Sequence, residues 1–112
     1  MIVQFTDQVE PGPLAPALVP VWTVISSAPV PGVVWITALG NGQHMEGSKH
    51  TPSPDTGWKV AAVDLDAVKT KRNVKIVMHL REALPDSFDV VHEDKGEENE
   101  HIHIEYDPHT HA

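Results

Sequence analysis

The chain has 112 residues, with 16 Asp and Glu residues against 8 Lys and Arg residues, a formal net charge of -8 and no cysteine. This length allows one domain, and the lack of cysteine excludes disulfide frameworks, thiolate zinc fingers and cysteine nucleophiles. The negative charge disfavours nucleic acid as a partner, because phosphate backbones attract cationic proteins. No apolar stretch reaches the ~20 residues of a membrane span, and no secretory signal is recognisable. We expect synthesis in the cytoplasm, and the place of action stays open.

The N-terminal part of the chain is expected to contribute one helix and one buried strand. Apolar residues recur at three- and four-residue spacing over 14–27, which is typical of one helical face, although Pro20 should kink the helix interior. The β-branched and aromatic residues 33–37 predict a buried strand. Residues 1–6 fit either a short strand or an ordered tail.

The C-terminal part is expected to combine strands with one amphipathic helix. Residues 40–58 are rich in Gly, Ser, Pro, Asn and Asp, which favours a long surface loop. We therefore predict one α+β domain over 1–112, in which a small antiparallel sheet is flanked by two main helices and the segments 1–9 and 108–112 are peripheral. The remaining predicted elements are strands over 60–66, 88–92 and 101–106 and a helix over 69–84.

The strongest local signal for chemistry is the segment His-Ile-His-Ile-Glu-Tyr at 101–106. Because strand side chains alternate between faces, His101, His103 and Glu105 share one face while the aliphatic residues between them occupy the other. Two imidazoles on one face of a strand are typical of a metal cleft. The alternative interpretation is a half-exposed strand with polar residues on its solvent side.

His50 and Asp64 complete a candidate set of metal ligands with His103. An aspartate within an apolar strand is unfavourable unless it is paired or bound to a cation. Three nitrogen and oxygen ligands leave zinc a fourth position for water, which is the arrangement of catalytic sites. The alternatives are a solvated loop histidine at position 50 and a carboxylate at position 64 that bonds a backbone amide.

The order of these motifs resembles the signature of the LAS zinc metallopeptidases. That group unites D-alanyl-D-alanine carboxypeptidases and dipeptidases, murein endopeptidases and the hedgehog signalling domain. Within that group, the chain resembles short phage-type peptidases of the D-alanyl-D-alanine carboxypeptidase family. The resemblance rests on the lead-in Gly-Gln-His-Met-Glu-Gly-Ser-Lys-His at 42–50, Ala62-x-Asp64-Leu65, Phe-Asp-Val-Val at 88–91 and His101-x-His103.

The resemblance implies a fold, a cofactor and a reaction. By position, His50, Asp64 and His103 match the ligands of one Zn²⁺, His101 matches the active-site histidine, and Ser48 matches a substrate-positioning residue. The implied fold is a small antiparallel sheet flanked by helices. The implied reaction is zinc-dependent hydrolysis of a peptide bond in a bacterial peptidoglycan peptide, of the D-Ala-D-Ala carboxypeptidase or endopeptidase type.

The chain departs from the family pattern at two places. The segment 51–59 between the first two ligands is longer than the family has, and we expect it to border the substrate groove with Trp58. Many relatives carry an arginine after the first core strand to stabilise the developing oxyanion. This chain has none there, and Gln43 or Lys49 is the available substitute.

Three side chains are candidates for handling the proton: Glu98, Glu100 and His101. The spacing Glu100-x-x-His103 repeats a motif of the D-alanyl-D-alanine dipeptidases and favours Glu100, whereas strand alternation favours His101. We expect Glu100 to act as the base and His101 to stabilise the transition state. The alternative function is a non-catalytic zinc-binding domain of the same fold, acting as a binding module or a phage structural module.

Overall fold

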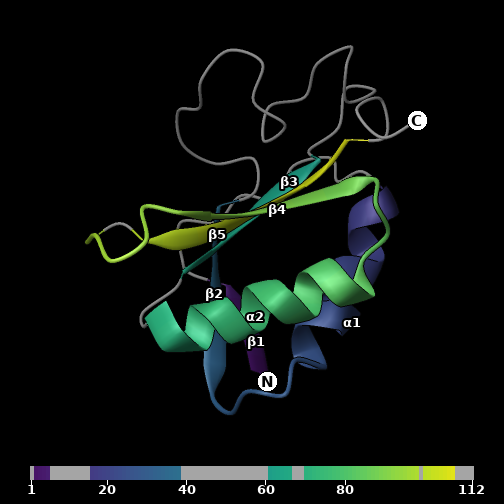
Figure 1. The fold of residues 1–112 in the computed structure, drawn as a ribbon. Coiled ribbons are helices and arrows are strands. Elements are labelled where there is room, and N and C mark those ends of the chain that lie inside the picture. Colours follow the sequence, from purple (N-terminus) through teal and green to yellow (C-terminus); the bar gives the residue numbers. More distant parts are fainter. Residues whose placement is uncertain (1, 6–15, 39–60, 67–69, 99, 108–112) are drawn as a thin grey trace.

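A computed structural model describes residues 2–5, 16–38, 61–66, 70–98 and 100–107 of the chain (Figure 1). This part forms a small α+β fold, as predicted from the sequence. The elements in chain order are β1 (Ile2–Phe5), the 3₁₀ helix η1 (Pro16–Leu18), α1 (Val19–Ser26), β2 (Val33–Ala38), β3 (Ala62–Asp66), α2 (Thr70–Ala83), β4 (Phe88–Glu93) and β5 (His101–Tyr106).

The strands form one five-stranded sheet in the order β1-β2-β3-β5-β4. β1 pairs with β2 in parallel, whereas β2, β3, β5 and β4 pair with their neighbours in antiparallel fashion. The sheet is therefore mixed, and the expectation of an antiparallel sheet is wrong at the β1 edge. The reason is the connection: α1 lies between β1 and β2 in the chain, and strands joined through a helix typically run parallel.

The first helix is shorter than the range predicted for it. Pro20 stands in the first turn of α1, after η1, rather than in a helix interior. A proline is tolerated there because the first backbone N–H groups of a helix have no intrahelical acceptor. In place of a kinked interior, the chain forms a 3₁₀ turn over Pro16–Leu18 followed by a short α-helix. Neither α1 nor α2 is both long and apolar enough to cross a bilayer.

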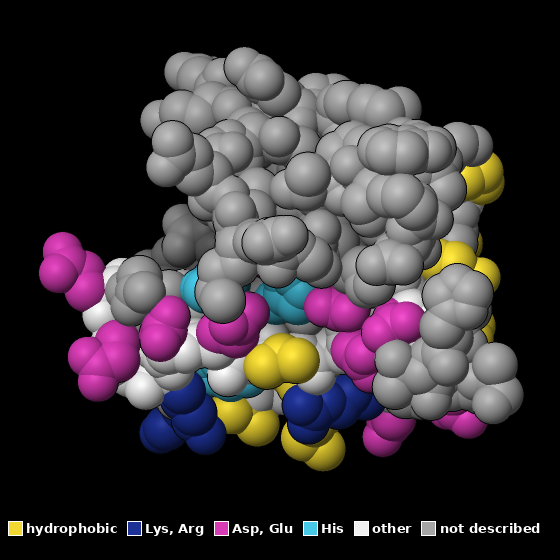
Figure 2. All heavy atoms as spheres, turned by 90° about the horizontal axis from the view of Figure 1, so that it is seen from above, with side chains coloured by type: hydrophobic (Ala, Val, Ile, Leu, Met, Phe, Trp, Pro, Cys, Tyr) yellow, Lys and Arg dark blue, Asp and Glu magenta, His cyan; other side chains and the backbone are white. Residues whose placement is uncertain are grey.

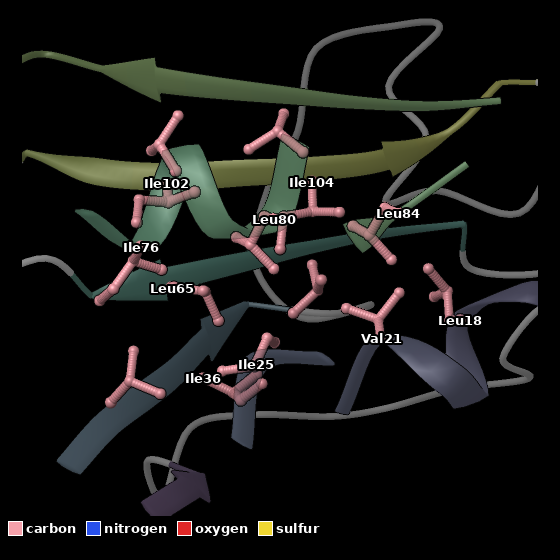
Figure 3. Close-up of a cluster of buried hydrophobic side chains, with 14 of the residues drawn as sticks. Leu18, Val21, Ile25, Ile36, Leu65, Ile76, Leu80, Leu84, Ile102 and Ile104 are labelled. Atoms are coloured by element: carbon pink, nitrogen blue, oxygen red, sulfur yellow. The ribbon is translucent and has the colours of Figure 1, made fainter. Parts of the chain in front are cut away.

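Both helices pack against the same face of the sheet and enclose the hydrophobic core (Figures 1 and 3). In β5, Ile102 and Ile104 are fully buried in this core. Side chains alternate along a strand, so His101, His103 and Glu105 line the opposite face of the sheet. The other fully buried core residues include Leu18, Val21, Ile25, Ile36, Leu65, Ile76 and Leu80.

Candidate metal centre

Asp64 and His103 meet on the face of the sheet that points away from the helices. They are directly paired in the β3–β5 ladder although they are 39 positions apart in the chain. Asp64 Oδ1 lies 2.8 Å from His103 Nδ1, and the two side chains are only 16% and 14% exposed. The structure thus brings together two of the three side chains that the sequence singled out as metal ligands.

The second ring nitrogen of His103 also has a carboxylate partner. His103 Nε2 lies 2.9 Å from Glu105 Oε1, on the same strand and the same face. Burial lowers the pKa of the His103 imidazole, but the hydrogen bonds to Asp64 and Glu105 and the two negative charges outweigh burial and raise the pKa from 6.5 to about 9. In the protein without metal, His103 is therefore a cation that donates one hydrogen bond to each carboxylate.

This raised pKa predicts how the stability of the metal-free protein depends on pH. His103 has a higher pKa in the folded chain, about 9, than the ordinary 6.5. Its contribution to the free energy of unfolding is then complete below pH 6.5 and is lost as the pH rises through 9, at most about 1.4 kcal/mol per pH unit. Denaturant titrations between pH 6 and 9.5 with a chelator should show this fall, and His103→Gln should flatten it. Equal slopes for the two proteins would contradict the prediction.

A carboxylate from β4 also reaches this face. Glu93 pairs with His101 in the β4–β5 ladder, and its Oε1 lies 3.5 Å from His101 Nε2 and 3.9 Å from His103 Nδ1. The Glu93 side chain is 43% exposed, so solvent reaches it. Glu93 is not among the site residues predicted from the sequence. Strand alternation could have identified Glu93, because Asp89, Val91 and Glu93 share one face of β4.

Glu100 lies on the other face of the sheet, away from Asp64 and His103. It precedes β5 and shares the side of Ile102, and it is only 7% exposed. Its Oε2 accepts hydrogen bonds from the Asn73 side-chain amide and, at 2.9 Å, from His92 Nε2, while its Oε1 accepts the Gly96 N–H at 2.6 Å. These contacts tie the β4–β5 turn to α2. The structure therefore does not bring Glu100 to the candidate ligands.

Of the three candidates for handling the proton, only His101 shares the face of His103. Glu98 is exposed in the turn between β4 and β5. The other predicted site residues, Gln43, Ser48, His50 and Trp58, lie outside the described residues, as does the whole segment 51–59.

Acidic side chains continue along this face on both sides of the histidines. Figure 2 shows Asp and Glu side chains in magenta and His side chains in cyan gathered in one band of the surface. Asp89, Glu105 and Asp107 offer carboxylate oxygens within 4.8 Å of one another, the one group of three potential ligands among the residues that the structure describes. An all-oxygen group suits Mg²⁺ or Ca²⁺ better than zinc. The Asp64–His103 pair supplies the nitrogen and oxygen donors that zinc binds.

The cleft at the C-terminal end of α2 does not belong to this face. It has a volume of about 250 Å³ and none of the predicted site residues lines it.

Comparison with known proteins does not assign the chain to a family, because it matches no family model, no curated protein and no solved structure.

Proposed function

We propose that the chain is a zinc-dependent peptidase that hydrolyses a peptide bond in bacterial peptidoglycan peptides. The observation that carries the proposal is the 2.8 Å contact between Asp64 and His103 on the face of the sheet that points away from the helices. The ligand roles of both side chains follow from the motif order in the sequence, and the contact joins positions far apart in the chain. The peptidoglycan substrate, of the D-Ala-D-Ala carboxypeptidase or endopeptidase type, rests on the sequence resemblance alone.

The donor atoms of this pair fit zinc. Zinc takes carboxylate oxygen and imidazole nitrogen at ~2.0–2.2 Å, which separates two ligand atoms of a tetrahedral site by roughly 3.3–3.6 Å. Asp64 Oδ1 and His103 Nδ1 are 2.8 Å apart, so a small separation of the two side chains lets both bind one ion. His50 is the expected third ligand. Bound zinc would supply a Lewis acid for the scissile carbonyl and a water of lowered pKa.

We assign the handling of protons and charge to two side chains that lie beside the pair. Glu93 carries a partly exposed carboxylate 3.9 Å from His103 Nδ1. It acts as the general base, the role that the sequence spacing had suggested for Glu100. It accepts a proton from the attacking water and passes it to the leaving amine. His101, whose Nε2 lies 3.5 Å from the same carboxylate, donates a hydrogen bond to the oxygen on which negative charge develops.

Metal analysis and digestion of purified peptidoglycan test the proposal on the full chain without a histidine tag. We expect one zinc per chain and the release of peptide fragments or D-alanine, with activity lost in chelator and restored by added zinc. Stoichiometric zinc without any cleavage would favour the non-catalytic zinc-binding domain. Absence of both zinc and cleavage would refute the proposal entirely.

A further inference from the structure

Each ring nitrogen of His103 faces a different carboxylate. Nδ1 lies 2.8 Å from Asp64 on the neighbouring strand, and Nε2 lies 2.9 Å from Glu105 on its own strand. A neutral imidazole that binds a metal keeps one N–H and offers the other nitrogen's lone pair. The ring thus has two possible metal positions: on the Asp64 side through Nδ1, or on the Glu105 side through Nε2. Glu105 itself lies within 4.8 Å of the carboxylate oxygens of Asp89 and Asp107.

We infer that Glu105 is a positioning residue that holds the proton on Nε2 and thereby selects Nδ1 of His103 as the metal-binding nitrogen. This inference rests on the proposed zinc site and specifies how it is built. Two observations favour the Nδ1 side. The predicted ligand Asp64 lies there, and Glu93 approaches the ring from there, 3.9 Å from Nδ1.

Glu105 is suited to this role by its place in the strand. It is two residues after His103, so strand alternation holds it on the same face regardless of loop conformation. Its side chain is only 23% exposed, which shields the hydrogen bond from water. A carboxylate that accepts the free N–H of a metal-bound histidine fixes the ring orientation and raises the basicity of the ligand. Removal of such a partner typically weakens metal affinity by ~10–100-fold.

The direct test is the tautomer of His103 in the zinc-loaded protein. Nitrogen-15 NMR of protein labelled at histidine distinguishes Nε2–H from Nδ1–H, with His103→Gln identifying the resonance. We expect the proton on Nε2. A proton on Nδ1 would place the metal on the Glu105 side and overturn the inference, while the zinc site itself would stand.

Zinc affinity, measured by competition with a chelating dye, is the second readout. Glu105→Ala should weaken affinity by ~10–100-fold, and Glu105→Gln, whose amide oxygen still accepts the Nε2 proton, should recover much of the loss. Asp107→Asn removes one charge from the same acidic group and is the matched control, expected to change affinity less than Glu105→Ala.

Two outcomes separate the inference from the proposed function. Tight zinc binding by the wild type with no loss in Glu105→Ala, or an equal loss in Asp107→Asn, would overturn the role of Glu105 and leave the peptidase proposal standing. Zinc binding that depends on Glu105 in a protein that cleaves no peptidoglycan would support the role of Glu105 and refute the peptidase proposal. Absence of zinc binding by the wild type would overturn both.

Discussion

Replacing His103 with alanine should remove stoichiometric zinc and lower peptidoglycan cleavage by more than 100-fold. The loss should exceed the ~10–100-fold that follows from removal of a residue that merely hydrogen-bonds a ligand, because a metal–ligand bond itself disappears. The measurement is zinc content by elemental analysis together with cleavage rate per folded protein. Asp64→Ala should have the same effect, since the two side chains contact each other at 2.8 Å and form one site.

The matched control for this prediction is His79→Ala. His79 lies on α2, on the helical side of the sheet, and contacts Ser27 and the Val24 carbonyl rather than the candidate site. It should keep zinc and activity. If His103→Ala retained one zinc per chain and near-normal cleavage, the ion would be held elsewhere and the proposed centre would be wrong.

Glu93→Gln should keep zinc and lower turnover by ~10²–10⁴-fold, the usual contribution of a general base. Glu100→Gln should act differently, because the Glu100 carboxylate is buried and accepts hydrogen bonds from Asn73, His92 and the Gly96 N–H. Loss of its charge should lower the free energy of unfolding by about 1–3 kcal/mol while turnover per folded molecule stays close to normal. Denaturation curves and turnover measured on the same samples separate the two effects.

Glu97→Gln provides the neutral reference for both variants. Glu97 is exposed in the β4–β5 turn, and its hydrogen bond to Asp94 uses the backbone N–H, which the substitution retains. It should change neither stability nor turnover measurably. The opposite pattern would be loss of turnover in Glu100→Gln at unchanged stability, with normal turnover in Glu93→Gln. It would show that Glu100 is the general base, as the sequence spacing indicates.

Most elements of this fold can be predicted from local patterns. The β-branched and aromatic residues of 33–37 and the alternation of 101–106 correspond to β2 and β5, and the amphipathic spacing of 69–84 corresponds to α2. These patterns predict the elements because each helix or strand buries one face, and the spacing of its apolar residues shows which face that is. The parallel pairing of β1 is different. It requires that Ile2–Phe5 joins the sheet as a strand, whereas the local pattern of residues 1–6 fits either a short strand or an ordered tail.

The candidate site divides in the same way. Strand alternation by itself places His101 and His103 on one face, and an aspartate within an apolar strand by itself indicates a paired or metal-bound carboxylate at position 64. Only the β3–β5 register brings Asp64 against His103, and only the β4–β5 register brings Glu93 against His101.

Glu100 shows most clearly what tertiary structure adds. Residues three positions apart in a regular strand lie on opposite faces, so Glu100 can reach the side of His103 only if it precedes the strand and its loop turns that way. β5 does begin at His101, and the spacing Glu100-x-x-His103 alone does not record which way the preceding residue turns. The buried Asn73 and the partly buried His92 hold the carboxylate on the helical side. Sequence by itself determined which residue types are available for metal chemistry and which elements carry them. The pairing of strands and the packing of α2 decided which of them meet, because contacts between distant segments depend on register and burial across the whole domain.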